Sequence, residues 1–142
     1  MRGLHLDTEA WLWWHLSPDR LASAALSLFE ERRAILHLSA ASSWEIAIKQ
    51  ALGKLVLPAP AHRFVPEQMA EDGLEPLPIK HAHALRVGSL PPHHSDPFDR
   101  ILVAQAQLEG LSLLTADPQI VRYDVDFVWA SSAAPPRRRR RS

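Results

Sequence analysis

The sequence of 142 residues contains no cysteine, and this absence removes several classes of protein at once. Without cysteine there are no disulfide-stapled scaffolds, no thiolate zinc sites and no cysteine nucleophiles. A chain of this length forms one domain whose hydrophobic core needs no such cross-links. The lack of cysteine also suits a reducing cytoplasm.

Long apolar runs are lacking as well. The longest uncharged stretch, residues 34–44, falls short of the roughly 18 apolar residues that indicate a transmembrane helix. The N-terminal segment reaches Asp7 too early to contain the apolar region of a signal peptide. Glycine-rich phosphate loops, Gly-x-Ser-x-Gly and His-Glu-x-x-His are also absent. We therefore expect a soluble intracellular domain with no membrane association.

The formal charge is zero, but it is unevenly distributed. Five of the 16 basic residues form the run Arg137–Arg141, and the rest of the chain carries 11 basic against 16 acidic residues. An acidic globule is unlike a preformed nucleic-acid groove, so a nucleic-acid substrate would have to be attracted locally or through metal ions. We expect residues 131–142 to form a disordered Pro/Arg-rich tail, either a localisation or polyanion-binding sequence or simply a charged end.

Strand-like and helix-like segments alternate along the chain, and this alternation predicts the fold class. It favours right-handed crossovers and a three-layer α/β/α fold, with a mostly parallel sheet of about five strands and helices on both faces. Such a sheet binds its ligands outside the carboxyl ends of the strands. The expected strands are 2–6, 34–38, 77–79, 111–114 and 125–129; the expected helices are 8–16, 18–32, 43–52, 62–72, 80–87 and 97–109, with a helical turn at 118–121.

Four carboxylates fall where that crevice should be. Asp7 follows the first expected strand, and Asp117 comes three residues after the end of the fourth. Glu45 and Asp99 each lie in the expected first turn of a helix. Converging carboxylates repel one another unless a cation lies among them, and Mg²⁺ or Mn²⁺ prefers such oxygen ligands. A metal held in this way promotes displacement at phosphorus, so the pattern predicts metal-dependent phosphodiester hydrolysis.

Helix capping is the competing explanation for each acid. The residues Ser42 and Glu45 have the spacing of a capping box, with Ser42 as the N-cap. Asp96 fits an N-cap ahead of a helix-opening proline better than it fits a metal ligand. The other acids have comparable explanations as caps, turn residues or partners of a helix dipole. Each acid is ordinary alone, and it is the set of four that favours a site.

The sequence contains two pairs of closely spaced histidines, and neither pair is expected to form a metal site. His93 and His94 could bind a transition metal, but no third ligand has suitable spacing, so a stacking or hydrogen-bonding loop pair is favoured. His81 and His83 cannot share one face of a short helix and are expected to be exposed to solvent. The crowded tryptophans of the first helix are interpreted as core or dimer interface rather than as an RNA-stacking platform; they are Trp11, Trp13 and Trp14.

Several blocks of sequence form a recognisable set of motifs in a fixed order. They are Leu6-Asp7-Thr8 with Trp13-Trp14, residues 39–49 (SAASSWEIAIK) with Gly53-Lys54-Leu55, residues 90–100 (LPPHHSDPFDR) and residues 113–117 (LLTAD). This set resembles the PIN-domain toxins of bacterial VapBC toxin–antitoxin pairs. The resemblance runs from residue 2 to about 130 and implies a PIN-like domain over residues 1–130.

The resemblance implies roles for particular residues. The catalytic acids would be Asp7, Glu45, Asp99 and Asp117, with Asp7 and Asp99 as direct ligands of Mg²⁺, for which Mn²⁺ would substitute. Supporting roles fall to further residues of the same motifs. These are Thr115, whose hydroxyl would orient an acid, and Thr8, Asp96 and Arg100.

The resemblance also implies a function. The chain would be a cytoplasmic bacterial toxin and an endoribonuclease acting on tRNA or another structured RNA. It would form a homodimer, and the C-terminal segment of a cognate VapB-like antitoxin would block the site. The antitoxin would also carry larger toxin–antitoxin assemblies to DNA.

Two other functions stay open. One is a catalytically silent PIN-like binding module whose acids only cap helices. Glu9 and Ser95 fit that alternative, because relatives usually carry histidine and a basic residue at these positions. The other is a housekeeping PIN nuclease that matures RNA without an antitoxin.

Overall fold

The central sheet of the protein is entirely parallel. The computed structural model describes residues 3–31 and 34–134, and within them five strands form one sheet in the order β3-β2-β1-β4-β5. Because every pairing is parallel, the carboxyl ends of all five strands lie at one edge. The strands are β1 (Gly3–Leu6), β2 (Ile35–Ser39), β3 (Glu75–Leu77), β4 (Ser112–Thr115) and β5 (Phe127–Trp129).

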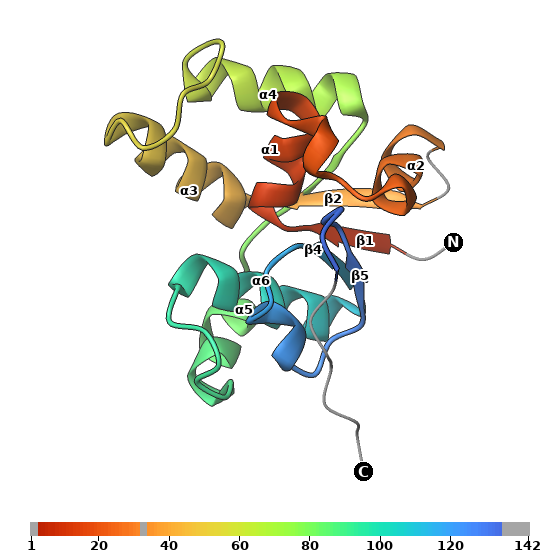
Figure 1. Cartoon of the computed structure of the whole chain (residues 1–142). Helices are drawn as coiled ribbons and strands as arrows, with labels where there is room; N and C mark the ends of the chain where they lie inside the picture. Colours follow the sequence, from red (N-terminus) through yellow and green to blue (C-terminus); the bar gives the residue numbers. More distant parts are fainter. Residues whose placement is uncertain (1–2, 32–33, 135–142) are drawn as a thin grey trace.

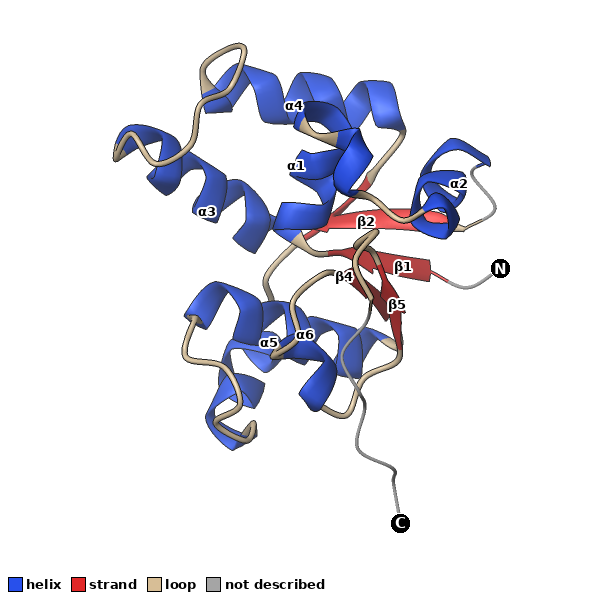
Figure 2. Cartoon of the chain, viewed as in Figure 1, coloured by secondary structure: helices blue, strands red, loops and turns tan. Residues whose placement is uncertain are grey.

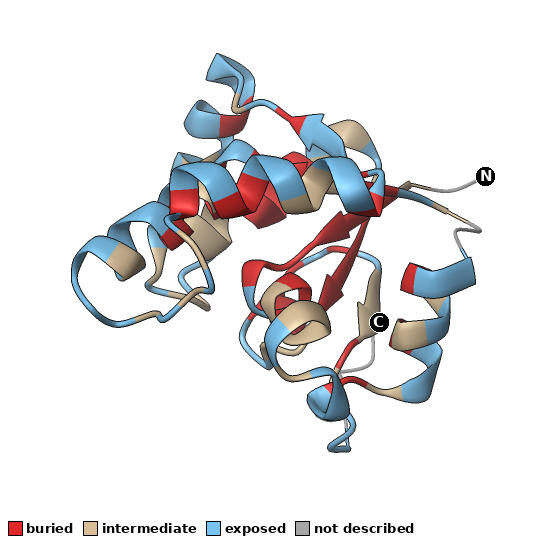
Figure 3. Cartoon of the chain, turned by 90° about the horizontal axis from the view of Figure 1, so that it is seen from above, coloured by how far each residue is buried: buried red, intermediate tan, exposed pale blue. Residues whose placement is uncertain are grey.

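Helices cover both faces of this sheet (Figures 1 and 2). On one side lie α1 (Thr8–Leu16), α2 (Ser23–Glu31), α3 (Ala40–Ala51) and α4 (Ala61–Asp72); on the other lie α5 (His81–Arg86) and α6 (Pro97–Glu109). One apolar cluster contains Trp11, Phe29 and Phe64, and another contains Leu102 and Tyr123. Buried positions gather on the central strands and on parts of the helices, whereas the edge strands β3 and β5 are mostly exposed or intermediate (Figure 3). The expected three-layer α/β/α fold is confirmed.

The helix expected over residues 18–32 is broken in the structure. Pro18–Arg20 forms a short 3-10 turn (η1), and α2 begins only at Ser23. Between them, Leu21 bridges to Ser131, and the Ala22 N–H donates to the Ala130 carbonyl over 2.8 Å. A distant C-terminal segment therefore takes the backbone groups that a continuous helix would need, and the prediction of one helix was wrong.

The same contacts extend the structure slightly beyond residue 130. The Ser132 N–H donates to the Arg20 carbonyl over 2.9 Å, and the Trp129 indole N–H donates to the Ala133 carbonyl over 2.9 Å. Part of the segment expected to form a disordered tail is thus bonded to the domain. The run Arg137–Arg141 lies outside the described residues.

Helix α3 begins earlier than expected, and this changes the interpretation of Glu45. Ser39 is the N-cap, and its hydroxyl accepts from the Ala41 N–H over 3.0 Å. Ser42 lies inside the helix, where its hydroxyl accepts from the Thr8 hydroxyl over 2.7 Å. Glu45 consequently lies in the second turn of α3. The predicted capping box was wrong, and capping does not explain this buried acid.

The remaining elements differ from expectation in smaller ways. Helix α6 starts as predicted, with the Asp96 carboxylate accepting from the Phe98 N–H over 2.8 Å. Strand β3 precedes the expected position, and α5 is followed by a 3-10 turn, η2 (Val87–Ser89); another, η3 (Ile120–Arg122), precedes β5.

His81 is exposed, but His83 is buried, with its Nε2 atom 3.3 Å from Glu109, so its predicted exposure was wrong. Among the described helices, none has the length and hydropathy to cross a bilayer.

A buried carboxylate joins α1 to α4. Asp72 Oδ2 accepts from the Trp11 indole N–H over 2.9 Å and lies 2.7 Å from His15 Nε2, while Oδ1 accepts from the Gln68 amide over 3.0 Å. Burial acts to raise the pKa of Asp72, but these hydrogen bonds outweigh it and hold the pKa below its ordinary value. The bonded carboxylate therefore stabilises the fold in its ionised form.

Removing this carboxylate should destabilise the protein. Asp72→Ala is expected to lower the free energy of unfolding by about 2 kcal/mol, because the buried Trp11 N–H loses its acceptor. Because folding lowers the pKa of Asp72, its carboxylate stabilises the protein fully above the ordinary aspartate pKa of about 4. This stabilisation is lost as the pH falls through the pKa of the folded state. Urea denaturation at neutral pH and at about pH 3 measures both effects. Exposed Glu67→Ala is the control, and equal stability of Asp72→Ala and wild type at neutral pH would contradict the analysis.

Candidate active site

The site forms where the strand order of the sheet reverses. Strand β1 pairs with β2 on one side and with β4 on the other, so connections leave this point in opposite directions. Parallel sheets open a ligand-binding crevice at such a point, beyond the carboxyl ends of the strands. Asp7 follows β1, and Asp117 comes two residues after β4.

Asp7 occupies this crevice with both carboxylate oxygens held. As the N-cap of α1, it accepts from the Glu9 N–H through Oδ1 over 3.1 Å. Its Oδ2 accepts from the Thr115 hydroxyl over 2.6 Å, and that hydroxyl accepts from the Asp117 N–H over 3.0 Å. Asp7 therefore does cap α1, as the competing explanation allowed, and it lies in the cleft as well; Thr115 connects the two strand-end acids.

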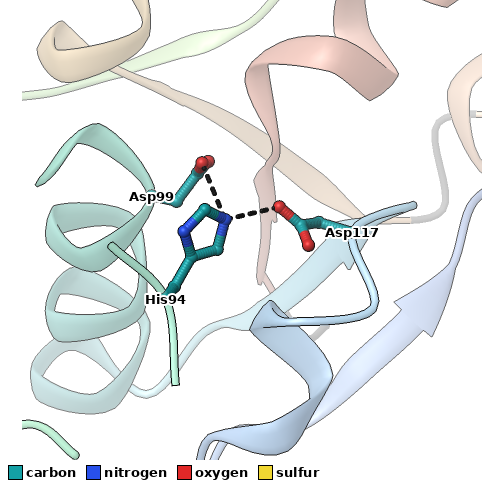
Figure 4. Close-up of side chains that lie close together, drawn as sticks. All are labelled: His94, Asp99 and Asp117. Carbon is teal, nitrogen blue, oxygen red and sulfur yellow. Dashed lines mark hydrogen bonds and ion pairs between the residues drawn. The ribbon is translucent and has the colours of Figure 1, made fainter. Parts of the chain in front are cut away.

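His94 lies between Asp99 and Asp117 (Figure 4). Its Nε2 atom is 3.2 Å from Asp99 Oδ2 and 2.7 Å from Asp117 Oδ2. Its Nδ1 atom accepts from the Asp96 N–H over 3.0 Å, which leaves the proton of the neutral ring on Nε2, facing the carboxylates. One ligand atom from each of His94, Asp99 and Asp117 lies within 4.8 Å of the others, a spacing that suits a shared metal ion.

Sequence reasoning missed this role of His94. The hydrogen-bonding interpretation was right in kind, but the partners are acids 5 and 23 residues away, which pair spacing does not reveal. The signal available was the position of His94 just before the Asp96-Pro97 helix start. A residue there lies beside the first turn of α6, which carries Asp99.

Glu45 contributes a carboxylate that is only half satisfied. Its Oε2 pairs with the Lys49 ammonium over 2.7 Å, one helical turn further along α3. Its Oε1 is buried and has no hydrogen-bond partner. The Glu45 side chain is only 6% exposed, so bulk solvent does not readily reach it. A buried oxygen without a donor is costly, and a cation or an ordered water would satisfy it.

The electrostatics of the cluster also favour a cation. Burial raises the pKa of Asp7 to about 6, against the hydrogen bonds from Thr115 and the Glu9 N–H. Burial, followed by the charges of Asp7, Asp96, Glu45 and Asp117, raises the pKa of Asp99 well above its ordinary value. Oxygen ligands in a crowded, desolvated set fit Mg²⁺ or Mn²⁺, which would relieve this repulsion.

The predicted acids line one cleft of about 610 Å³. Asp7, Glu45, Asp99 and Asp117 all line it, together with the predicted supporting residues Thr8 and Asp96. The four acids therefore lie together, as expected from the order of the strands. Asp7, expected to be a direct metal ligand with Asp99, lies in the cleft but outside the close group of His94, Asp99 and Asp117.

Arg100 is not among the residues that line the cleft; it braces the loop that carries His94. Its guanidinium donates to the carbonyls of Val87 over 2.9 Å and Pro91 over 3.0 Å, and to the Tyr123 hydroxyl over 3.1 Å. The same hydroxyl accepts from the His94 N–H over 2.9 Å. Arg100 therefore positions this wall of the cleft from behind, as a structural support.

The sequence pattern of the PIN domain family matches residues 4–126. The chain belongs to the PIN domain family. Ribonuclease VapC16 of Mycobacterium tuberculosis (strain ATCC 25618 / H37Rv) is 44% identical to this PIN domain over 73 residues, which cover 46% of this chain and 52% of that protein. The match therefore spans about half the length of that relative.

Solved structures share the fold of this PIN domain. DNA-bound VapBC from Salmonella typhimurium has a TM-score of 0.66 at 16% identity, over 90% of this chain and 98% of that chain. VapBC2 from Rickettsia felis, bound to a promoter DNA fragment, has a TM-score of 0.67 at 12% identity with the same coverage. FitAcB from Neisseria gonorrhoeae has a TM-score of 0.58 at 18% identity, over 87% and 95% of the two chains.

Metal binding by this PIN domain should be visible as stabilisation. Adding MnCl₂ or MgCl₂ to EDTA-treated protein is expected to raise its Tm, because a ligand of the native state shifts the folding equilibrium. Asp99→Asn should abolish the shift, and without metal it should raise the Tm, because folding no longer has to bury a carboxyl group whose ionisation burial and the neighbouring acids oppose. Differential scanning calorimetry measures both, with exposed Glu30→Gln as the control. The same Mn²⁺ shift in wild type and Asp99→Asn would place the ion elsewhere.

Proposed function

We propose that the chain is the toxin of a type II toxin–antitoxin pair, a metal-dependent endoribonuclease that hydrolyses RNA phosphodiester bonds. The observation that carries this proposal is the convergence of Asp7, Glu45, Asp99 and Asp117 in one cleft at the switch point of the sheet. Similarity to a VapC ribonuclease and to VapBC folds supports the same function. Capping alone does not account for Glu45, which disfavours a silent module.

Asp7 and Asp99 would hold Mg²⁺, for which Mn²⁺ would substitute, and Glu45 and Asp117 would complete the site. When bound, the ion supplies positive charge to the phosphate and to the attacking water. Thr115 fixes the rotamer of Asp7 by its 2.6 Å hydrogen bond. Lys49 neutralises one oxygen of Glu45, which leaves Oε1 to accept a hydrogen bond from the attacking water.

The partners follow the similar proteins. VapBC from S. typhimurium is a DNA-bound assembly, and we extend this arrangement to a cognate VapB-like antitoxin for the PIN domain of residues 1–130. The antitoxin would inhibit the toxin with its C-terminal segment and carry larger assemblies to DNA. The substrate would be tRNA or another structured RNA in the bacterial cytoplasm.

Loss of a single carboxylate should abolish RNA cleavage. Asp7→Asn and Asp99→Asn are each expected to reduce the cleavage rate by about 100-fold or more, because they remove charge that holds the ion at the phosphate. Sequencing of RNA ends after controlled expression measures cleavage, and circular dichroism checks the fold. EDTA should inactivate the wild type, and Mn²⁺ should restore it.

The controls separate the alternatives. Exposed Glu30→Gln should cleave at the wild-type rate. Full activity in soluble Asp7→Asn or Asp99→Asn would overturn the proposal. A wild type that binds Mn²⁺ but leaves RNA intact would instead be a silent binding module.

A homodimer would use the exposed apolar stripe of α3. Trp44, Ile48 and Leu52 are 57%, 37% and 63% exposed, and their spacing of four residues places them on one face of the helix. Apolar side chains aligned in this way favour association with another apolar surface. The stripe lies on the same helix as Glu45, so a dimer through it would fix α3 beside the active site.

Breaking the stripe should dissociate the dimer. Ile48→Asp and Leu52→Asp are expected to convert a dimeric wild type to a monomer, because each would bury a charge in an apolar contact. Size-exclusion chromatography with light scattering measures the mass. Leu85→Asp is a matched control, since Leu85 is 78% exposed on α5, in the other helical layer. Unchanged mass in both α3 variants would exclude this interface.

A further inference from the structure

The cleft continues far beyond the four acids. Its volume of about 610 Å³ accommodates a ligand much larger than an ion and one phosphate. Helix α1 forms one wall, with Asp7 at its N-terminus and Trp13, Leu16 and Ser17 towards its C-terminus. At 1.5 Å per residue, Trp13 lies about 9 Å along the helix from Asp7. The cleft therefore has a second end, away from the strand ends.

A basic side chain lines this second end. Arg20 follows α1 in the chain, so this helix leads from an acidic to a basic part of the cleft. Burial acts to lower the pKa of Lys49, but its bond to Glu45 and the neighbouring carboxylates outweigh this and raise the pKa. Lys49 thus pairs with Glu45, while Arg20 is the cation beside Trp13 at the far end.

Trp13 differs from the other tryptophans of α1. Trp11 is buried in the core, and Trp14 stacks on Phe29 with ring centroids 4.3 Å apart. Trp13 is only partly buried, lines the cleft and carries the Arg20 guanidinium 5.0 Å from its ring centroid. The expectation of core or dimer interface for all three was therefore incomplete, because Trp13 also forms part of the cleft wall.

The backbone of Arg20 is held in place. Its carbonyl accepts from the Ser132 N–H over 2.9 Å, and the next residue, Leu21, bridges to Ser131. The Leu21 N–H closes the 3-10 turn onto the Pro18 carbonyl over 3.1 Å. A cation with a fixed backbone loses less entropy on binding a ligand than one on a free loop.

We propose that Trp13 and Arg20 form a subsite for an unpaired nucleotide that neighbours the cleaved phosphate. The base stacks on the Trp13–Arg20 pair, and the Arg20 guanidinium contacts the adjoining phosphate. Aromatic rings and arginine planes stack unpaired bases, and basic side chains follow the backbone, in grooves that bind single strands. The proposal rests on the proposed function, because the acids would hold the cleaved phosphate at the other end.

A protein segment is the alternative occupant of this end of the cleft. Leu12 and Leu16, on α1 with Trp13, also line the cleft and would suit apolar side chains. The Arg20 guanidinium over the Trp13 ring favours a polyanion with planar groups, which is RNA. The choice between RNA and protein is therefore an outcome of the test.

The test measures binding of a labelled 12-nucleotide unstructured RNA to full-length protein carrying Asp99→Asn, which removes cleavage. Adding Trp13→Ala should weaken the Kd about tenfold, whereas Trp13→Phe, which keeps a ring, should change it less than about threefold. Arg20→Gln should weaken binding and reduce the slope of log Kd against log salt by about 0.7. Arg63→Gln, on the exposed surface of α4, is the matched control and should change neither.

Tryptophan fluorescence distinguishes direct contact between Trp13 and RNA from a purely structural role of Trp13. RNA should quench part of the tryptophan emission of the Asp99→Asn parent, and Trp13→Phe should remove that quenching while RNA still binds. Unchanged affinity in Trp13→Ala overturns the proposal, as does quenching that persists in Trp13→Phe. Loss of antitoxin binding in Trp13→Ala with unchanged RNA affinity would identify a protein groove and also overturns it. Failure of the proposed function is separate: the wild type would then not cleave RNA with Mg²⁺ or Mn²⁺, whatever the quenching.

Discussion

The burial of several carboxylates in one cleft is the constraint around which this PIN domain is arranged. Parallel pairing brings the carboxyl ends of β1 and β4 together, and Asp7 and Asp117 lie there as a consequence. The neighbours relieve the repulsion only in part. Thr115 donates to Asp7 and Lys49 pairs with Glu45, but Glu45 Oε1 has no partner and the pKa of Asp99 stays raised. A site that is stable but incompletely compensated is suited to binding a cation.

The two walls of the cleft are built by different means. On the β1 side, Asp7 is fixed by the strand end, by its role as N-cap and by the buried Thr115, so its side chain can adopt few other conformations. On the α6 side, His94 belongs to a loop, and Arg100 and Tyr123 replace the missing secondary structure with bonds to that loop. Asp7 therefore faces a wall of the cleft that is held by side-chain hydrogen bonds. Substitutions in the loop of His94 would change the geometry of the cleft more than substitutions around Asp7.

The sequence predicted those features that depend on local chemistry or on sheet topology. The start of α6 at Asp96 and the gathering of four distant acids both follow from such rules. Two of the errors involve a partner far away in the chain. Thr8 donates to Ser42, which lies inside α3 rather than capping it, and Ser131 bridges to Leu21 where the helix expected after Pro18 is broken. No local pattern contains these contacts, because they exist only once the sheet has formed.

Helix α1 links the four acids to the rest of the cleft. Its N-cap is Asp7, one of these acids, and the indole N–H of Trp11 donates to Asp72 in the core, which fixes the helix relative to α4. Trp13, two residues further on, therefore lies at a set distance from Asp7, and Arg20 is tied in turn to the C-terminal segment. The spacing between the acids and the basic end is thus determined by core packing rather than by a flexible loop. The two ends of the cleft therefore have a fixed separation. For an RNA ligand that spans both ends, binding of a nucleotide at the basic end would fix which phosphodiester bond lies at the acids.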